Sequence, residues 1–210
     1  AKCWMHTGPL RIDKEKMSKS LDNFITIKEA LKKFPSEAIR FFLISSHYRS
    51  PLNYSEEGVF EAKSSLDRLY TSLIDLDLKK ENQSNDADLI SPFRKAMEDD
   101  FNVPSALATL FEIAKLINLA KEKGNKKEAN ILGATLVHLA EPLGILQQNL
   151  EDYFRLGATL SNEEIQSMID QRNKARDDKD FELSDKIRDS LLEKGIVLED
   201  TDKGTIWKVR

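Results

Sequence analysis

Between residues 51 and 150, apolar side chains recur every three or four positions, and each periodic segment ends at a helix-breaking signal. Segments of this kind can bury their apolar stripes only against one another, so the region predicts an antiparallel helical bundle. The stripes are Val59, Leu66, Leu69, Tyr70 and Leu73; Phe93 and Met97; Leu107, Leu110, Phe111, Ala114 and Ile117; and Ile131, Leu132, Leu136, Leu139 and Ala140. We expect these side chains to form a core and assign no ligand to them.

Capping residues predict where several helices begin. Thr26 with Glu29, and Ser161 with Glu164, match the capping box, in which each side chain satisfies a backbone N–H of the other residue. Ser36 is predicted to cap a further helix. These signals place helices before and after the bundle in the sequence.

The end of the chain predicts a different architecture. Residues 149–160 lack periodicity and are predicted as a linker, followed by one helix to about residue 176 and another that stops at Gly195. Two strand-like runs, Ile196–Leu198 and Thr205–Val209, are joined through a turn signal at residues 202–204. We therefore expect a small α+β unit, close to the lower size limit for independent folding.

Composition narrows the class of protein. Hydrophobic residues make up 40% and charged residues 32%, which fits a helix-rich globular chain rather than a disordered one. Cys3 is the single cysteine, so an internal disulfide is excluded and a reducing cytoplasm is favoured. No apolar run stands out as membrane-spanning, and we expect no membrane partner. The chain begins with Ala1 in a strand-like segment, and we expect it to be a piece of a longer protein.

Charge is distributed unevenly along the chain. Residues 1–50 hold 10 Lys and Arg against 5 Asp and Glu, whereas the remaining residues are acidic in sum and bring the net charge to −4. A basic front end suits contact with phosphate groups, and the acidic remainder argues against a general nucleic-acid coat. RNA, if bound, would be held by selected residues.

Residues 16–20 read Lys-Met-Ser-Lys-Ser and follow an apolar stretch, residues 8–13, that predicts a short strand. The ammonium groups of Lys16 and Lys19 are carried on a small loop rich in hydroxyl groups. Such a loop can close over a triphosphate and neutralise charge that develops on departing pyrophosphate. A solvated loop without a ligand is the alternative for the pentapeptide alone. The candidate ATP-contacting residues are Lys16, Met17, Ser18, Lys19 and Ser20.

Further motifs are spread over nearly the whole chain. They are Trp4-Met5-His6-Thr7-Gly8, Lys16-Met17-Ser18-Lys19-Ser20-Leu21, the segments 36–43 and 47–55, Asp99-Asp100-Phe101-Asn102-Val103-Pro104-Ser105-Ala106, and the segments 176–181, 195–201 and 204–207. Together they resemble the class I aminoacyl-tRNA synthetases and, more narrowly, the C-terminal half of the bacterial cysteinyl-tRNA synthetases. A set of matches this widely distributed is far more specific than any single one.

The resemblance implies a mainly α chain in three parts. Residues 1–50 would end a Rossmann-type catalytic domain and carry the signature loop, residues 51–155 would form the bundle, and residues 156–210 an anticodon-binding unit. The family uses ATP with Mg²⁺, and zinc that binds the substrate thiolate through ligands upstream of the signature loop. No metal ligand is therefore expected in this chain. Lys19 would contact the ATP phosphates, and Lys16 would stabilise the loop or the same charge.

The residues predicted to bind tRNA lie in the last unit. A basic cluster there consists of Arg172, Lys174, Arg176 and Lys179. Basic groups beside the aromatic faces of Phe181 and Trp207 are suited to hold unstacked bases. Asp185 and Asp200 can accept hydrogen bonds from base amino and imino groups. The resemblance makes this unit the anticodon-binding end. The predicted contacts within it are Arg176, Asp185, Asp200, Phe181 and Trp207, and a solvated helix face is the alternative.

Histidine and cysteine positions were weighed as possible sites. Cys3 and His6 are three residues apart, but structural zinc needs four ligands, so core or strand positions are favoured. His47 is interpreted either as a contact to tRNA or the catalytic domain, or as a packing residue at a helix exit. His138 is expected in the bundle core or at its boundary. These three histidines include no His-x-Gly-His signature.

The sequence therefore predicts part of a cysteine–tRNA ligase, a cytoplasmic monomer whose full-length form acts on cysteine, ATP and cysteine tRNA. The chain alone is expected to be inactive because half of the active site is missing. One alternative is a cysteine ligase of amino-sugar thiol biosynthesis, which has no need of an anticodon-reading unit. Another is a non-catalytic helical RNA-binding protein, which would gain nothing from the signature loop.

Overall fold

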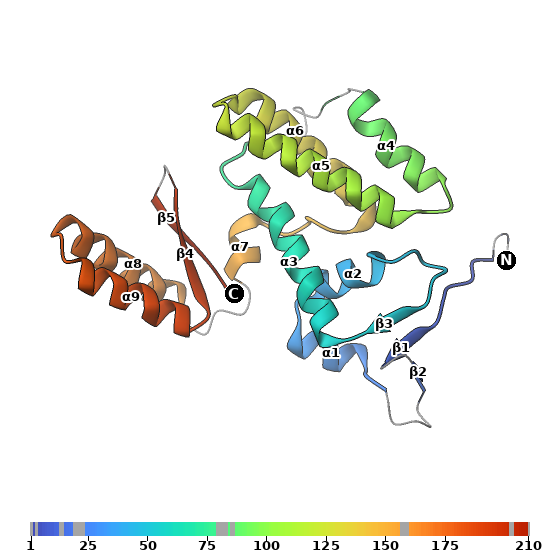
Figure 1. Cartoon of the computed structure of the whole chain (residues 1–210), viewed down its shortest axis with the longest axis horizontal. Coiled ribbons are helices and arrows are strands. Elements are labelled where there is room, and N and C mark those ends of the chain that lie inside the picture. Colours follow the sequence, from blue (N-terminus) through green and yellow to red (C-terminus); the bar gives the residue numbers. More distant parts are fainter. Residues whose placement is uncertain are drawn as a thin grey trace. The chain divides into compact units, whose positions relative to one another are not determined.

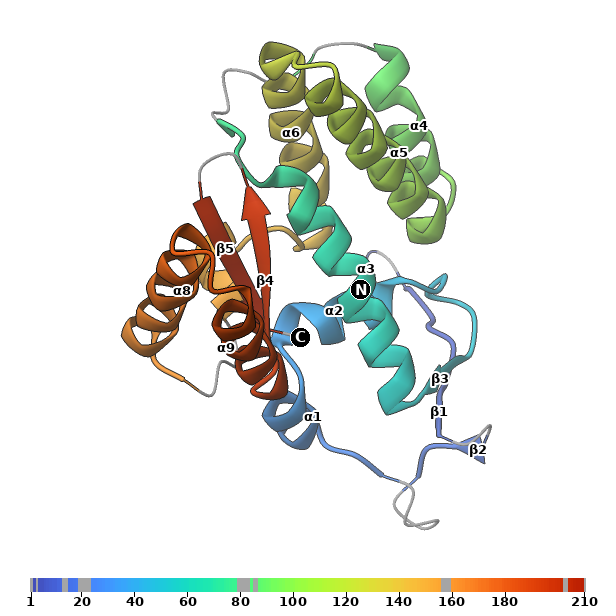
Figure 2. The same ribbon diagram turned by 60° about the vertical axis from the view of Figure 1, so that its left-hand side comes forward.

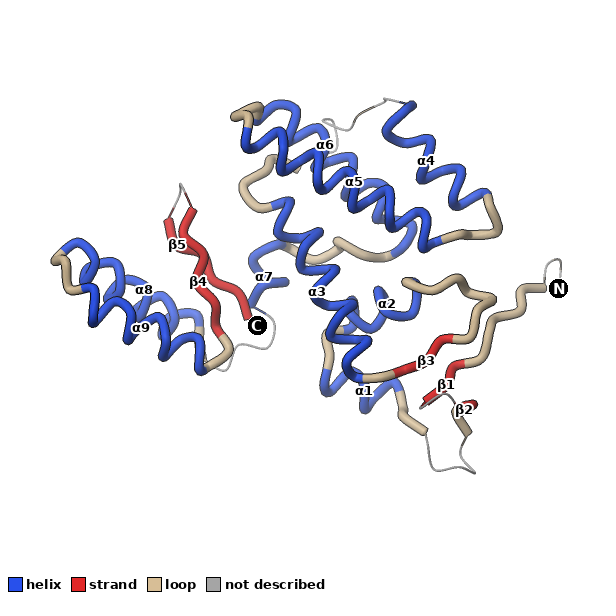
Figure 3. Tube along the Cα trace, viewed as in Figure 1, coloured by secondary structure: helices blue, strands red, loops and turns tan. Residues whose placement is uncertain are grey.

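The computed structural model describes residues 2, 4–12, 15–18, 24–78, 84, 87–155, 160–201 and 204–209. Helices account for most of this part of the chain, and its strands form two small sheets (Figure 3). The predicted mainly α fold is thereby confirmed. The chain divides into two compact units, Ala1–Gln147 and Gln148–Arg210, and each is described by itself (Figure 1).

The first unit opens with a three-stranded sheet. Its strands are β1 (Leu10–Ile12), β2 (Glu15–Lys16) and β3 (Leu52–Tyr54), in the order β2-β1-β3. β1 pairs antiparallel with β2 and parallel with β3. β1 confirms the strand predicted within residues 8–13. β3 was not predicted, because three residues are too few for a periodic pattern and the pairing partner lies far earlier in the chain.

Two short helices follow the signature segment: α1 (Ile27–Lys33) and α2 (Ser36–Ile44). The capping box of Thr26 and Glu29 is confirmed, with the Glu29 N–H donating to Thr26 Oγ1 over 3.1 Å and the Thr26 N–H to Glu29 Oε2 over 2.8 Å. The prediction that Ser36 caps α2 was wrong. Pro35 is the N-cap and makes no side-chain hydrogen bond, while Ser36 is the first helical residue.

The helical bundle of the first unit contains α3 (Glu56–Leu73), α4 (Ala87–Glu98), α5 (Val103–Glu122) and α6 (Lys126–Ala140). α5 packs against α4 on one side and α6 on the other, and α3 also contacts it (Figures 1 and 2). Most residues of the predicted stripes are buried, with Val59, Leu66, Leu110 and Leu136 fully so, whereas Met97, Phe111 and Ile131 are half-buried. A 3₁₀ turn, η3 (Glu141–Leu143), then ends at Gly144 in the left-handed region with φ +66°. The packing of α3, α4, α5 and α6 agrees with the predicted helical bundle.

Helix α5 also corrects the expectation about membrane-spanning runs. By length and composition Val103–Glu122 is apolar enough to cross a bilayer, which inspection of the sequence had missed. In the structure it lies against three other helices of the bundle, and 39% of its apolar window is buried. A core helix of a bundle passes the same test of composition.

The second unit contains α7 (Leu150–Arg155), α8 (Asn162–Asp177), α9 (Phe181–Glu193) and a hairpin of β4 (Ile196–Thr201) and β5 (Gly204–Val209). α8 packs on α9, α9 packs on β4, and α7 packs on β5. The core of this unit consists of Ile165, Ile169, Leu191 and Ile196. The capping box of Ser161 and Glu164 and the hairpin are confirmed. The linker prediction was wrong at residues 150–155, where α7 forms.

Candidate functional site

The signature segment continues directly from β2. Lys16 is the last residue of β2, exposed and paired with Arg11 of β1, and the Met17 N–H donates to the Leu10 carbonyl over 3.1 Å. Met17 and Ser18 are half-buried. Lys19 and Ser20 lie outside the described residues. The structure therefore anchors the first two residues of the predicted loop, Lys16 and Met17, to β1.

The entry to β1 is held by the connector between α2 and β3. The Gly8 N–H donates to the Tyr48 carbonyl over 2.8 Å, and the Leu52 N–H donates to the Pro9 carbonyl over 3.1 Å. A Cβ atom added to Gly8 would lie 2.2 Å from the Ser50 carbonyl oxygen, well inside any allowed contact. Only glycine permits the two backbones to approach this closely.

The same connector carries three side chains that meet Asp100, at the corner between α4 and α5. The Tyr48 hydroxyl donates to Asp100 Oδ1 over 2.6 Å, and Arg49 donates from Nε to Oδ2 over 2.7 Å and from Nη2 to Oδ1 over 3.1 Å. His47 Nε2 lies 3.9 Å from Oδ2. We call His47, Tyr48, Arg49 and Asp100 the Asp100 cluster. It ties the connector, and through it the entry to β1, to the bundle.

The electrostatics of the Asp100 cluster follow from these contacts. The hydrogen bonds from Arg49 and Tyr48 lower the pKa of Asp100 to about 2. The bond to Asp100 raises the pKa of the Tyr48 hydroxyl, because ionised Tyr48 could no longer donate to a carboxylate. Asp100 and Phe101 both have left-handed backbones, with φ +50° and +53°. Such a conformation is costly away from glycine and marks a corner that surrounding contacts must hold.

His47 and His138 lie in different surroundings. His47 stacks on the Tyr48 ring at 5.0 Å, and its Nδ1 accepts the Arg49 N–H over 3.3 Å, which agrees with the packing interpretation. His138 was predicted in the bundle core or at its boundary, and the core position was wrong: 52% of its side chain is exposed, and Nδ1 lies 3.8 Å from Glu141 Oε2. His138 lies in sequence among the apolar stripe residues of α6, but its side chain is exposed.

In the second unit, Asp200 of β4 accepts hydrogen bonds from three side chains. Arg172 donates from Nη1 to Oδ1 over 3.1 Å and from Nη2 to Oδ2 over 3.0 Å. Arg176 Nη1 donates to Oδ2 over 2.9 Å, and the Thr205 hydroxyl donates to Oδ1 over 2.8 Å. We call Arg172, Arg176, Asp200 and Thr205 the Asp200 cluster. These donors, led by Arg172, hold the pKa of Asp200 well below its usual range.

The structure brings some of the predicted tRNA contacts together and separates others. Arg176 and Asp200 are directly bonded, and Asp185 of α9 acts electrostatically on Arg172. Phe181 begins α9 with 63% of its surface exposed. Trp207 is half-buried and packs against the core of the second unit. Phe181 is thus free of the core in the way that base stacking needs, whereas Trp207 is partly a core residue.

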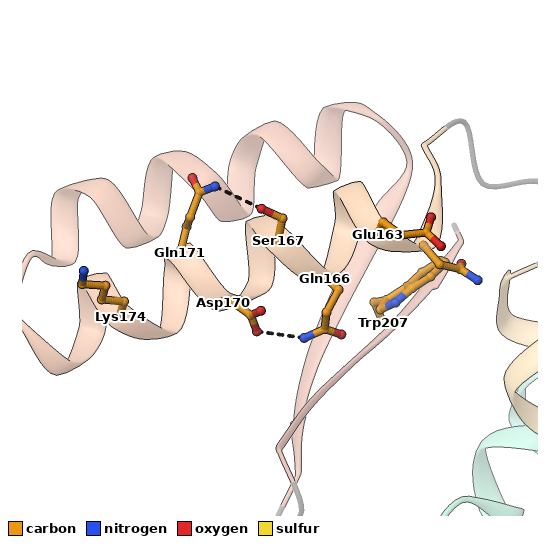
Figure 4. A pocket seen from close by; sticks show the side chains of 8 residues that line it. Glu163, Gln166, Ser167, Asp170, Gln171, Lys174 and Trp207 are labelled. Carbon is orange, nitrogen blue, oxygen red and sulfur yellow. Dashed lines mark hydrogen bonds between the residues drawn. The ribbon is translucent and has the colours of Figure 1, made fainter.

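An open groove of about 620 Å³ runs along α8 beside Trp207 (Figure 4). Trp207 and Glu163 lie near one end of it and Lys174 near the other. The Gln166 amide donates to Asp170 over 2.9 Å, and the Gln171 amide donates to Ser167 over 3.4 Å. The lining is Asn162, Glu163, Gln166, Ser167, Asp170, Gln171, Lys174 and Trp207. The groove is open and is lined mostly by residues with polar side chains, with one aromatic wall.

Sequence reasoning missed two members of the Asp200 cluster as site residues. Arg172 was recognised as basic but not as the residue that holds Asp200, and Thr205 was taken only as a strand residue. Two signals were available. Arg172 and Arg176 are four residues apart and so lie on one face of α8, and the hairpin register sets Thr205 directly opposite Asp200.

Within the part of the chain that the structure describes, no three His, Cys, Asp or Glu side chains gather as a metal site. Cys3 lies outside that part. The resemblance places the zinc ligands of the family upstream of the signature loop, and the described residues offer no other set of ligands.

Three family models match consecutive parts of the chain. The class I (C) tRNA synthetase catalytic domain matches residues 1–64, the DALR domain residues 92–147, and the cysteinyl-tRNA ligase anticodon binding domain residues 161–207. The chain thus belongs to the class I tRNA synthetases.

Curated relatives narrow the family further. The chain is 48% identical over 206 residues to a cysteine–tRNA ligase of Shewanella sediminis, covering 98% of this chain and 44% of the relative. It is 48% identical over 208 residues to a cysteine–tRNA ligase of Yersinia enterocolitica, covering 98% and 45%. Within its class, the chain belongs with the cysteine–tRNA ligases and matches their C-terminal portion. It spans less than half the length of these relatives.

One solved structure is also similar: a ternary complex of a LeuRS from Agrobacterium radiobacter K84 with tRNA and LeuAMS. It is 22% identical, has a TM-score of 0.49, and covers 65% of this chain and 20% of that chain.

Proposed function

We propose that this chain supplies the signature loop and the tRNA-binding parts of a cysteine–tRNA ligase. The full-length enzyme would condense cysteine with ATP to cysteinyl-adenylate and pyrophosphate, and then pass the cysteinyl group to the terminal adenosine of cysteine tRNA. The observation that carries this proposal is the identity of 48% to such ligases over 98% of the chain. ATP, Mg²⁺ and cysteine tRNA would be its ligands, and zinc would bind elsewhere in the enzyme.

In the catalytic half of the reaction, Lys19 would contact the ATP phosphates and offset the negative charge that develops on pyrophosphate. Lys16 would stabilise the loop or the same charge, Ser18 and Ser20 would offer hydroxyl groups, and Met17 would pack the loop down. The pairing of Lys16 with β1 supports this arrangement because it fixes where the loop starts.

In the second unit, Arg176, Asp185 and Asp200 would read base edges of the anticodon, with Phe181 and Trp207 as stacking faces. The match of residues 161–207 to an anticodon-binding family supports this assignment. It also favours a tRNA ligase over the cysteine ligase of amino-sugar thiol biosynthesis, which needs no anticodon reader. The enzyme would be a cytoplasmic monomer.

The role of Lys19 is tested by the Lys19→Ala variant of the full-length enzyme. Removal of one donor to developing charge costs about 2.7–4 kcal/mol, a loss of roughly 10²–10³ in rate. Pyrophosphate-exchange kinetics should show a lower rate of adenylate formation with little change in the apparent affinity for cysteine. An unchanged rate would refute the role. The 210-residue chain alone should show no exchange, and any cysteine-dependent exchange would overturn our placement of the active site.

The role of the second unit is tested by deleting residues 161–210 from the full-length enzyme. Aminoacylation would be compared for cysteine tRNA and for an anticodon-swapped version. The deletion should remove most of the difference between the two tRNAs and leave adenylate formation nearly intact. If the truncated enzyme still discriminates fully, anticodon reading belongs to another part of the molecule.

A further inference from the structure

Asp200 has all of its acceptor positions in use. A carboxylate offers about four lone-pair sites, two on each oxygen. Oδ1 accepts from Arg172 Nη1 at 3.1 Å and from Thr205 Oγ1 at 2.8 Å, while Oδ2 accepts from Arg172 Nη2 at 3.0 Å and from Arg176 Nη1 at 2.9 Å. A base amino or imino group can therefore bind Asp200 only if one of these donors leaves.

Burial decides which donor leaves. The Arg172 side chain is 8% exposed and bonds both carboxylate oxygens, so its departure would strand a buried charge. Its Nε is already buried without a hydrogen-bond partner among the described atoms, which makes the bonds to Asp200 the main compensation for its burial. The Arg176 side chain is 49% exposed and makes a single bond to Asp200. Water or RNA can replace that bond at low cost.

The Thr205 hydroxyl is held more firmly than Arg176. It has one proton, and the Asp200 oxygen at 2.8 Å is closer than its other acceptor, Asn173 Oδ1, at 3.4 Å. Thr205 also faces Asp200 directly in the β4–β5 register, so the backbone ladder keeps the two side chains together.

We infer that Arg172 is a positioning residue that fixes Asp200 for reading an unpaired base, and that Arg176 exchanges Asp200 for the RNA when the base arrives. The inference rests on the proposed anticodon-reading function and adds to it a division of roles between two arginines of one helix. Before binding, the Arg176–Asp200 pair shields a carboxylate that would otherwise repel RNA. After the exchange, the buried Arg172–Asp200 pair is unchanged.

A fixed Asp200 carboxylate explains how the site would discriminate between bases. An ionised carboxylate only accepts hydrogen bonds, so it favours an amino or imino edge and rejects a carbonyl edge at the same place. Rejection needs a carboxylate that cannot turn away, and the two parallel bonds from Arg172 prevent rotation. Lysine at position 172 would keep the charge but lose the two-pronged geometry.

The test uses the 210-residue chain and two RNA hairpins, one with the cysteine anticodon and one with a swapped anticodon. Binding of each hairpin is measured at fixed salt, and discrimination is the ratio of the two dissociation constants. Arg172→Lys should reduce that ratio about tenfold with little change in affinity for the swapped hairpin. Arg188→Lys, the same change at an exposed arginine of α9, should leave the ratio unchanged.

The exchange itself is followed by NMR of the arginine side chains. When the cysteine hairpin is added, the guanidinium signal of Arg176 should shift and that of Arg172 should stay in place. A shift of Arg172 with Arg176 unmoved would overturn the inference.

The outcomes separate this inference from the proposed function. If the unmodified chain binds both hairpins equally, anticodon reading fails and the inference falls with it. If the unmodified chain discriminates and folded Arg172→Lys discriminates equally well, the inference alone fails. Should Arg172→Lys not fold by circular dichroism, Thr205→Val decides instead. That variant removes one donor to Asp200 and no charge, and it must reduce the ratio at least threefold.

Discussion

The Asp100 cluster and the Asp200 cluster hold similarly exposed carboxylates with very different arginines. The side chains of Asp100 and Asp200 are 46% and 48% exposed. Each accepts two hydrogen bonds from one guanidinium and one from a hydroxyl group, and Asp200 accepts a further bond from Arg176. Yet Arg49 is 60% exposed, whereas Arg172 is 8% exposed. Apart from the added bond from Arg176, the main difference between the clusters is that the cation is buried in one and exposed in the other, while both anions stay at the surface.

An exposed arginine and a buried arginine suit different tasks. An exposed pair is screened by salt and contributes little to stability, but it can connect elements that are far apart in sequence. The Asp100 cluster does this, since it joins the connector before β3 to the corner after α4. A buried arginine cannot leave cheaply, so it fixes the direction of its partner. The Asp200 cluster does that within the second unit.

The largest expected effect is on the stability of the second unit. Arg172→Ala should lower its free energy of unfolding by about 3 kcal/mol, at the low end for broken buried pairs because the charge of Asp200 can be rehydrated. Arg49→Ala should lower that of the first unit only slightly. Urea unfolding followed by Trp207 fluorescence, in a Trp4→Phe background, reports the second unit. Arg172→Met keeps side-chain volume and separates lost pairing from lost packing. If Arg172→Ala and Arg49→Ala lowered the free energy of unfolding equally, burial of the arginine would not determine what the pair contributes.

A second prediction concerns the backbone approach that holds the Asp100 cluster to β1. Gly8→Ala should destabilise the first unit by about 1–3 kcal/mol, because its Cβ would meet backbone atoms that cannot turn aside. Gly124→Ala is the control: no atom lies within 4 Å, so only the strain of its left-handed backbone, φ +70°, remains. The urea midpoint by far-UV circular dichroism measures both. A Gly8→Ala variant as stable as the natural chain would contradict the close approach.

Lowering the pH should reduce the stability that each of the two clusters contributes. Folding lowers the pKa of each aspartate, so each contributes stability that is complete above the unfolded value of about 3.9 and is lost as the pH falls through the folded value. The stabilisation from Asp100 is lost as the pH falls to about 2, the folded-state pKa of Asp100, and the stabilisation from Asp200 is lost at lower pH. The unfolding free energy of the second unit should therefore fall between pH 4 and pH 2. Asp200→Asn should flatten this dependence, and a slope unchanged by that variant would exclude Asp200 as its source.

The smallest expected effect is the response to salt. At 1 M NaCl the Debye length is about 3 Å, and exposed charges are largely screened. The coupling between Arg49 and Asp100, measured by a double-mutant cycle, should shrink between 0.1 M and 1 M NaCl. The coupling between Arg172 and Asp200 should change much less. Equal salt sensitivity would show that burial of the arginine does not govern the pair.

Local signals in the sequence predicted much of the fold. The capping boxes at Thr26 and Ser161 and the apolar stripes of α3, α5 and α6 were confirmed, because both depend on residues only a few positions apart. Ser36 was misassigned because proline can end an extended segment and start a helix without a side-chain cap. β3 and α7 were missed because their pairing and packing partners, β1 and β5, lie elsewhere in the chain.

The candidate site was predictable in its residue types and less so in its geometry. Lys16 and the tRNA-binding candidates were chosen from motifs, and those motifs say nothing about which carboxylate meets which arginine. Arg172 looked like one basic residue among several on α8, and its burial against Asp200 depends on how α8 packs on the hairpin. Whether Lys19 and Ser20 contact ATP remains a prediction, since both lie outside the described residues.

The pairing of Asp200 with Thr205 limits how the hairpin tip can change in evolution. Thr201 of β4 pairs with Gly204 of β5, which leaves two residues between them. Side chains alternate between the faces of a strand, so one inserted residue that shifted the β5 register would turn Thr205 to the opposite face. It would also turn Trp207 away from α8. Insertions at this tip should therefore be tolerated only when they preserve the register, whatever their composition.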